Sequence, residues 1–341
     1  MQQFIRMVRI GIPRALLYYQ YYPMWKTFFE ELGAEVVVSP LTTQNILAEG
    51  SARVVADTCL PVKVYLGHVI SLVGECDYVF IPAIRSVKNK IYNCSKFLGL
   101  PDMTRAVVPE VPPILDIDID VTKGKRKLYQ AIYKLGRHLT WNPFKIRKAS
   151  LAAWRAYLNY RELMSSEGLT PPEAIERIPS TSTIEIKVPS DHPSSRRATI
   201  ALIGHPYLIY DEFINHRLIY RLKQADNKIL IPEMLTTEEL ESAIVRLVGG
   251  AYWTYEEEVV GAGGHYLENG ADGVIGIMAF GCGPDSLMMD MVRRQAVKLR
   301  TTPFMNLTIE EHTAEAGVVT RLEAFLDMIY RRKRREVEAC V

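Results

Sequence analysis

Short apolar runs alternate along the chain with longer amphipathic segments. In the first third, strands are predicted at residues 8–12, 35–38 and 78–81, each ending close to a proline. The 3.6-residue spacing of apolar positions between them predicts helices over about 16–32 and 62–73. A parallel sheet that is covered by helices on both faces has this alternation.

The last third of the sequence repeats the plan. Predicted strands cover residues 199–203, 228–231, 273–281 and 304–307, and the predicted helices cover about 211–224, 237–248, 252–268, 286–299 and 313–332. Because strand, proline, helix and strand follow one another in both regions, we interpret the chain as a diverged duplication. The predicted fold class is α/β, with two parallel-sheet domains.

A helical connector is expected between the two sheets. We predict an N-terminal α/β domain over 1–118, a helical connector and linker over 119–195, and a C-terminal α/β domain over 196–341. The connector is rich in basic and aromatic residues: Lys123, Lys125, Arg126, Lys127, Lys134, Arg137, Lys145, Arg147 and Lys148, with Tyr129, Tyr133, Trp141 and Trp154. It is either a solvated amphipathic face or a face for an acidic partner or a nucleotide-like phosphate.

The overall composition narrows the class of protein. The chain has 341 residues, of which 48% are hydrophobic and 23% charged, and its formal net charge is +2. This balance gives no global argument for nucleic-acid binding, and we expect none. With no apolar stretch near the roughly 20 residues of a membrane span and no signal-peptide pattern at the start, we expect a cytoplasmic protein without membrane contact.

The five cysteines are the main candidates for chemistry. The number of cysteines is odd and the sequence shows no export signal, which argues against a disulfide framework. The sequence also contains no CxxC pair, so a zinc ribbon is not expected. Cys282 ends the apolar run 273–281 and precedes Gly283–Pro284, which open a predicted helix. Ligands of open α/β folds bind at such strand ends, and a helix N-terminus favours a thiolate.

Cys59 and Cys94 lie in similar loops, and Cys94 follows the third predicted strand as Cys282 does in its half. Three thiols of this kind could hold an iron–sulfur cubane with one open iron position, or each could be a small buried hydrophobe. Cys76 directly precedes a strand and favours a structural thiol, while Cys340 lies beside the C-terminus. The roles of these last two stay open.

Four motifs carry a family resemblance. They are RIGIPRAL at 9–16 with YPMWKTFF at 22–29, DTCLPVK at 57–63 with Gly67 and His68, FGCGPDS at 280–286, and EHTAEAG at 311–317. Together they resemble the 2-hydroxyacyl-CoA dehydratase-related superfamily, and within it the acyl-CoA dehydratase activase-related branch, a domain of unknown function. The resemblance covers almost the whole chain.

The resemblance implies two Rossmann-like domains and one [4Fe–4S] cluster per chain, with Cys59, Cys94 and Cys282 as its metal ligands. It implies radical-type reduction or dehydration at the open iron of an oxygen-sensitive enzyme. A separate ATP-dependent activase would be the partner that supplies the electron, the assembly would be a homo- or heterodimer, and an acyl-CoA is one candidate substrate. Since the chain has no GxxxxGK[ST] phosphate loop, we do not expect it to bind ATP strongly.

Two other functions remain open: a non-catalytic iron–sulfur electron-transfer or accessory subunit, and a metal-free or zinc-binding ligand module. Several polar residues follow predicted strand ends or share a helix with a cysteine. Candidate catalytic residues are Lys63, His68, Glu310 and His312, and candidate substrate-binding residues are Arg14, Arg85, His205 and Ser286. For each, a cap or a core hydrogen bond is the alternative, and Asp285 and Ser286 fit helix N-caps.

Overall fold

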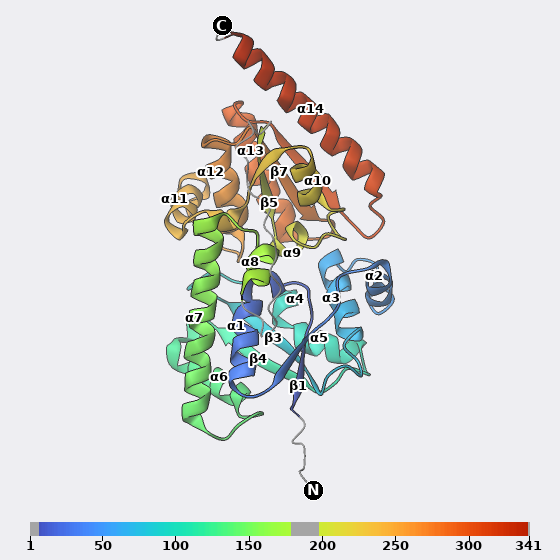
Figure 1. Cartoon of the computed structure of the whole chain (residues 1–341), viewed down its shortest axis with the longest axis vertical. Helices are drawn as coiled ribbons and strands as arrows, with labels where there is room; N and C mark the ends of the chain where they lie inside the picture. Colours follow the sequence, from blue (N-terminus) through green and yellow to red (C-terminus); the bar gives the residue numbers. More distant parts are fainter. Residues whose placement is uncertain (1–6, 179–197, 340–341) are drawn as a thin grey trace. The chain divides into compact units, whose positions relative to one another are not determined.

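The computed structural model describes residues 7–178 and 198–339. The chain divides into two compact units, which are taken one at a time below. The first unit contains Met1–Glu162 with Tyr252–Thr254, and the second contains Leu163–Ala251 with Tyr255–Val341 (Figure 1). None of the described helices is both long and apolar enough to cross a membrane.

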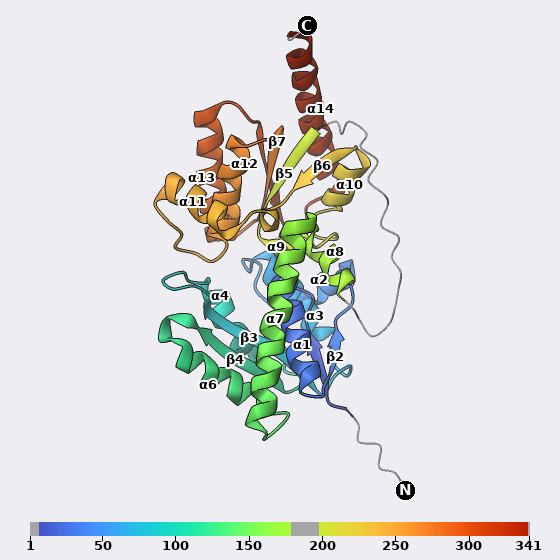
Figure 2. The same cartoon turned by 60° about the vertical axis from the view of Figure 1, so that its left-hand side comes forward.

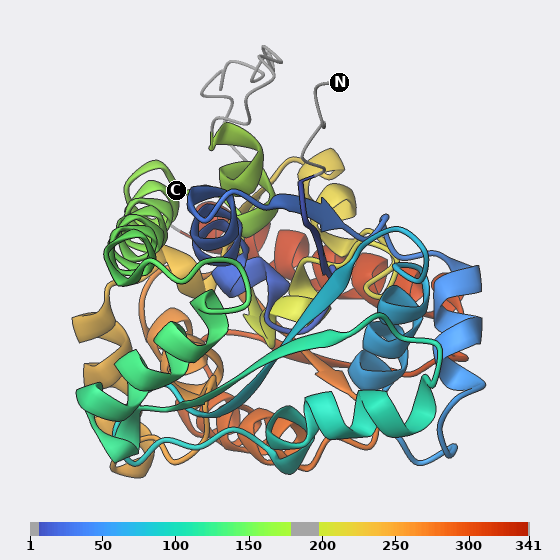
Figure 3. The ribbon, with the colours of Figure 1, turned by 90° about the horizontal axis from the view of Figure 1, so that it is seen from below.

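The first unit is built on a parallel sheet of four strands. These are β1 (Arg9–Ile12), β2 (Glu35–Val38), β3 (Tyr78–Ser86) and β4 (Ile114–Asp120), in the order β2-β1-β3-β4. All three pairings are parallel. Figure 3 brings this sheet to the front and shows helices on both of its sides.

Helices connect these strands and cover the sheet. They are α1 (Tyr18–Glu31), α2 (Gln44–Ser51), α3 (Leu60–Ile70), α4 (Ser95–Leu98), α5 (Leu100–Val107), η1 (Val121–Lys123), α6 (Lys125–Gly136) and the first part of α7 (Pro143–Glu167). Helices α2 and α3 pack backbone to backbone, because a Cβ atom on Gly67 would lie 1.9 Å from the Ile46 carbonyl oxygen. Only glycine fits this crossing, so Gly67 fixes how closely α3 packs.

The second unit repeats the same sheet. Strands β5 (Ala198–Gly204), β6 (Asn227–Leu230), β7 (Gly273–Ala279) and β8 (Phe304–Ile309) are parallel and follow the order β6-β5-β7-β8. The two central strands are buried on both faces, which explains why they read as continuous apolar runs. The predicted α/β fold with two similar parallel-sheet domains is confirmed.

The helices of the second unit lie on both sides of its sheet. Figure 2 shows α11, α12 and α13 on one side of β5, β6 and β7, and α10 on the other. The elements are α8 (Pro171–Arg177), α9 (Pro206–Ile209), α10 (Leu218–Gln224), η2 (Pro232–Met234), α11 (Thr237–Val248), η3 (Glu257–Gly261), α12 (Ala262–Glu268), α13 (Gly283–Leu299) and α14 (Glu315–Ala339).

Two predicted helices begin later than their apolar pattern indicates. The helix expected from 211 begins at Leu218, because the Asp211 carboxylate accepts the backbone N–H groups of Phe213 and Ile214 and holds a turn there. In the helix expected from 252, residues 252–254 belong to the first unit, where Trp253 pairs with Tyr92. A local side-chain hydrogen bond overrides the apolar periodicity at the first helix start, and a tertiary contact overrides it at the second.

The predicted domain boundaries at 118 and 195 stay predictions. The connector region holds α6, α7 and α8, and the linker at the end of the segment predicted over 119–195 falls on residues from 179 onward, which lie outside the described residues.

Candidate metal centre

The carboxyl ends of β5 and β7 lie side by side in the second unit. The two strands are parallel neighbours, and Gly204, the last residue of β5, pairs with Ile277. A Cβ atom on Gly204 would lie 2.6 Å from the Ile277 carbonyl oxygen, and the φ angle of Gly204 is +154°. Because Gly204 has no side chain, the backbone at the end of β5 can pass close to the backbone of β7. His205, the next residue, therefore lies beside the end of β7.

A tight turn after β7 positions Cys282. Gly281 has a φ angle of +77°, and the Cys282 N–H donates to the Ala279 carbonyl oxygen at 3.2 Å. Cys282 is the N-cap residue of the 17-residue helix α13 and is half-buried. The positive end of the helix dipole at this position stabilises an anionic group.

Asp285 does not cap the helix as the sequence suggests. Its Oδ2 atom accepts the backbone N–H of Ala279 at 3.0 Å, so the carboxylate turns back beneath the strand end, and the residue is fully buried. The Ser286 hydroxyl also caps no N–H group: it donates to the Cys282 carbonyl oxygen at 2.9 Å. Within the first turn of α13, the Asp285 side chain therefore points to the end of β7 and not to solvent.

His205, Cys282 and Asp285 form one cluster. Their ligand atoms all lie within 4.8 Å of one another. His205 Nδ1 lies 2.5 Å from Asp285 Oδ1, but the contact lacks the direction of a hydrogen bond, and neither atom has a hydrogen-bond partner among the described residues. Both side chains are almost completely buried, at 3% and 0% exposure, so two unsatisfied polar atoms face each other away from water.

Such a pair is costly unless something compensates it, since an unsatisfied buried polar group costs about 1–3 kcal/mol. A cation between the two atoms would satisfy the carboxylate and the imidazole lone pair together. Tetrahedral zinc binds nitrogen, oxygen and sulfur at about 2.0–2.3 Å. Two ligand atoms of such a zinc ion are roughly 3.3 Å or more apart. Metal binding would therefore lengthen the present 2.5 Å distance between Nδ1 and Oδ1 by somewhat under 1 Å.

Aromatic side chains hold the imidazole from two sides. The His205 ring stacks on Tyr207, with centroids 5.0 Å apart, and meets the edge of Tyr255 at 4.8 Å. Tyr255 has a φ angle of 75°, which is strained for a bulky residue, and the π-helical turn η3 follows it. Strained residues and π-turns cluster at functional sites, so both support a site here.

The predicted cysteine ligands divide between the units. Cys59 is the N-cap residue of α3 and Cys94 the N-cap residue of α4, and both are half-buried in the first unit. Cys282 belongs to the second unit. Because each unit is described by itself, a [4Fe–4S] cluster on these three residues stays a prediction.

Two catalytic candidates of the first unit are buried in α3. The His68 ring nitrogens lie 2.9 Å from the Ser39 and Thr42 hydroxyl oxygens, and burial, assisted by the Arg14 charge, lowers the His68 pKa to about 3. Lys63 is 4% exposed and donates to the Ala56 carbonyl oxygen at 2.9 Å. These contacts are those of structural core residues, and a catalytic role for either stays a prediction.

The remaining candidates lie at the ends of strands. In the first unit, Arg14 bonds Ser39, with its backbone N–H 2.7 Å from the hydroxyl, and the Arg85 side chain donates to Asp118 at 2.9 Å. In the second unit, Glu310 follows β8, where its N–H donates to the Thr313 hydroxyl, and the side chain of His312 is 82% exposed. Neither Glu310 nor His312 belongs to the group of ligand atoms around Cys282.

Sequence reasoning placed His205 among the substrate-binding candidates and missed Asp285. The available signal was an acidic residue three positions after a strand-end cysteine, in the same half as a histidine that follows the first strand. That spacing is also the spacing of a helix cap, which is why the sequence favoured a cap.

Comparison with known proteins gives a family match. A family model described as the CoA enzyme activase uncharacterised domain (DUF2229) matches residues 9–235. The match contains His205 and ends before Cys282 and Asp285. A search of curated proteins finds no relative of the chain.

One solved structure is aligned with the chain at 10% identity, over 96% of this chain and 95% of that one: "Crystal Structure Analysis of the Glycotransferase of kitacinnamycin". Its TM-score of 0.21 is too low to carry an argument about fold or function.

The family match corrects the predicted function. It identifies the activase branch and not the dehydratase subunits, so both the iron–sulfur dehydratase function and its alternative, an iron–sulfur electron-transfer or accessory subunit, are wrong. The predicted partner, a separate activase acting on this chain, is wrong for the same reason. Three of the motifs that carried the resemblance, RIGIPRAL, FGCGPDS and EHTAEAG, include a turn at a strand end, and proteins that share a fold can share such turns while their activities differ.

Proposed function

The chain belongs to the family of the CoA enzyme activase uncharacterised domain, and on this premise we propose that it is a metal-dependent component of a cytoplasmic activase for a CoA-dependent enzyme. The family supports the activase role, and the cluster in the second unit supports the metal.

One observation carries the metal: His205 Nδ1 and Asp285 Oδ1 are buried at 2.5 Å from each other without hydrogen-bond geometry, beside the Cys282 thiol. Imidazole, thiolate and carboxylate together suit zinc or ferrous iron and not magnesium or calcium, which prefer oxygen ligands. A divalent cation is therefore the compensating group that this set of donors selects.

The surrounding contacts define what each ligand contributes. The Ala279 N–H orients the Asp285 carboxylate, and Tyr207 and Tyr255 hold the His205 ring. Cys282 is the partly exposed member of the three. Three protein ligands leave one position of a tetrahedral metal open, as in catalytic zinc sites, and a group of the target enzyme would bind there.

The first experiment measures metal content. The full chain is stripped with a chelator under reducing, anaerobic conditions, reloaded with Zn²⁺ or Fe²⁺, desalted and assayed for metal and sulfide. We expect about one metal per chain without sulfide, and loss of that metal in His205→Ala, Cys282→Ala and Asp285→Ala. Cys76→Ala is the matched control, because this thiol lies in the other unit and bonds the Leu72 carbonyl oxygen.

Two results would overturn the mononuclear site. One is metal content that His205→Ala and Asp285→Ala leave unchanged. The other is about four irons with sulfide, lost in Cys59→Ala and Cys94→Ala, which would instead support the three-cysteine cluster.

The second experiment tests the activase role. The tagged full chain is purified from its own cells, and copurifying CoA-dependent enzymes are identified by mass spectrometry. We expect the metal-loaded protein, with ATP and the other copurified proteins, to raise the activity of such an enzyme, and His205→Ala to fail. If wild type binds metal but no CoA-dependent enzyme is enriched or activated, the activase role is wrong while the metal site stands.

A further inference from the structure

In one long segment of the first unit, every formally charged side chain is a lysine or an arginine. Residues 121–161 contain no Asp or Glu, although the whole chain has 39 of them, and they hold eleven of its 41 Lys and Arg residues. The rest of the chain thus has 30 basic and 39 acidic residues, a net charge of −9 against +11 here. The eleven are Lys123, Lys125, Arg126, Lys127, Lys134, Arg137, Lys145, Arg147, Lys148, Arg155 and Arg161. A charge asymmetry of this size indicates an anionic ligand.

Several aromatic side chains in this segment are exposed. Trp141 and Phe144 are 76% and 80% exposed, and Tyr129 and Trp154 are also exposed. Aromatic rings among cations are typical of surfaces that stack nucleobases, because every base offers a flat face and each nucleotide brings a phosphate.

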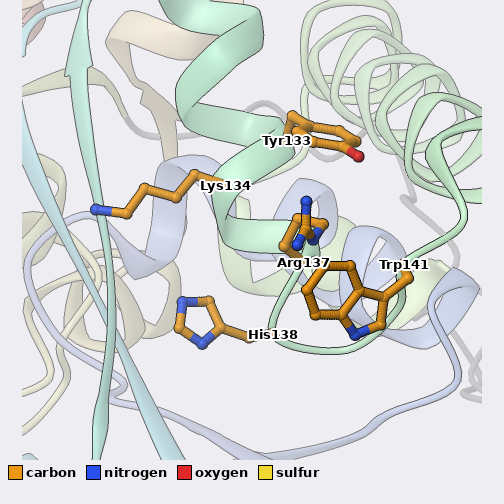
Figure 4. A pocket seen from close by; sticks show the side chains of 5 residues that line it. All are labelled: Tyr133, Lys134, Arg137, His138 and Trp141. Atoms are coloured by element: carbon orange, nitrogen blue, oxygen red, sulfur yellow. The ribbon is translucent and has the colours of Figure 1, made fainter.

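The two features meet in one pocket at the end of α6 (Figure 4). Its volume is about 390 Å³, and it is lined by Tyr133, Lys134, Arg137, His138 and Trp141. Figure 4 shows Arg137 between the rings of Tyr133 and Trp141, with Lys134 and His138 to one side. Ligand pockets commonly measure about 300–1,000 Å³, so this volume suits one small ligand.

Arg137 is the central residue of the pocket. Its guanidinium carbon lies 3.4 Å from the centre of the Trp141 ring and 5.8 Å from that of Tyr133. Its Nε atom is buried and has no hydrogen-bond partner among the described residues. No ion pair joins Lys134 or Arg137 to a carboxylate in the described part of the chain, so the positive charge of these two side chains is not neutralised there.

We propose that this pocket binds a nucleoside phosphate. The base stacks on the open face of Trp141, and the phosphate accepts hydrogen bonds from Arg137 with Lys134 beside it. Arginine suits this role because its planar fork matches phosphate oxygens while its face stacks on an aromatic ring.

Two other anionic ligands fit less well. An acidic peptide would be attracted by the cations, but it would leave the exposed Trp141 ring without a partner of its own shape. An inorganic anion would use Arg137 and Lys134 but would leave the Trp141 ring without a partner. Side-chain recognition also needs no glycine-rich loop, so the missing phosphate-loop motif predicts weak binding rather than none. This site lies in the first unit and does not depend on the metal centre or on the proposed activase role.

The test measures binding of fluorescent mant-ADP to the full chain by anisotropy, with ADP, adenosine and inorganic phosphate as competitors. We expect ADP to displace the probe, and adenosine or phosphate alone to compete at least tenfold less well, since each retains only half of the recognition. Arg137→Ala and Trp141→Ala should each weaken binding at least tenfold, and Arg137→Lys should fall between Ala and wild type.

Arg155→Ala and Trp154→Ala are the matched controls, because both residues belong to the same basic segment but do not line the pocket. They should change the affinity for mant-ADP less than twofold, and circular dichroism checks that every variant is folded. The proposal is wrong if ADP does not displace the probe at millimolar concentration, or if the folded pocket variants bind like wild type. It is equally wrong if a dT12 oligonucleotide binds and the control variants weaken it as much as the pocket variants do, because the surface would then bind a nucleic-acid strand.

Discussion

The two sheets share one strand order, yet the buried histidines of their units are in opposite states. In the first unit, both ring nitrogens of His68 lie 2.9 Å from the hydroxyl oxygens of Ser39 and Thr42. In the second, His205 Nδ1 faces the Asp285 carboxylate at 2.5 Å without a hydrogen bond.

The comparison shows that burial alone does not identify a functional histidine. His68 is fully satisfied by neutral groups and stays neutral, which is the expected state of a structural core residue. His205 is equally buried, but its Nδ1 atom has no hydrogen-bond partner among the described residues, and a metal cation would bind that atom. Four predictions can break or sharpen this contrast, and they are taken from the largest expected effect to the smallest.

The largest effect concerns metal affinity. His205→Ala should weaken Zn²⁺ binding by at least about 100-fold, or about 2.7 kcal/mol, because one of three protein ligands is lost. His68→Ala should leave the affinity within about twofold. Competition of the protein with a chromogenic zinc chelator measures both values, and an equal loss in the two variants would remove the distinction between the histidines.

The next effect concerns the stability of the first unit. His68→Ala should lower its unfolding free energy by about 2–4 kcal/mol, because a cavity forms and the Ser39 and Thr42 hydroxyl groups lose their partner. Native-state hydrogen exchange of the β1 amides measures this without requiring both units to unfold together. His138→Ala, an exposed residue of the same unit, is the control, with an expected change within about 0.5 kcal/mol.

A third effect depends on pH. The pKa of His68 is about 3 in the folded chain and about 6.5 when unfolded, so below pH 6.5 the unfolded state takes up a proton that the folded state refuses. The first unit should therefore lose up to about 1.4 kcal/mol per pH unit as the pH falls from 6.5 toward 3, and nothing from this residue above 6.5. The slope is read as the difference between wild type and His68→Gln in exchange experiments at several pH values. Identical slopes would show that His68 does not stay neutral.

The smallest effect concerns the thiol of Cys76 in the first unit. Burial raises the pKa of Cys76 to about 11, so at pH 8 only about one thiol in a thousand is ionised. Iodoacetamide should therefore modify Cys76 slowly, with a rate that rises about tenfold per pH unit, and Cys76→Ala should leave metal content unchanged. Mass spectrometry of timed samples measures the rate, with urea-unfolded protein as the reference. Rapid labelling at pH 8 would place Cys76 among the reactive thiols.

The sequence predicted most of the architecture because burial leaves a local trace. Central strands such as β5 and β7 are covered on both faces, so they appear as uninterrupted apolar runs, and amphipathic helices appear between them. Helix starts were less predictable. At Asp211 a side chain takes the N–H groups that would have begun the helix, and at Tyr255 the chain changes from one unit to the other.

The sequence predicted only part of the candidate metal site. Cys282 stood out because a strand, a turn and a helix start are local features of the sequence. Asp285 looked like a helix cap, since its spacing from the strand end is the same whether its carboxylate turns outward or back beneath the strand.

The sequence by itself determined the central strands, most of the longer helices, the duplicated sheet plan and the thiol after β7, because each depends on neighbours along the chain. Only the tertiary structure decided that β5 and β7 are adjacent in the sheet, that Gly204 brings His205 to the same edge, and that Asp285 points inward to meet it. The pairing of two unsatisfied polar atoms is a property of distance and direction in space. Residues 80 positions apart carry no sign of it in their order.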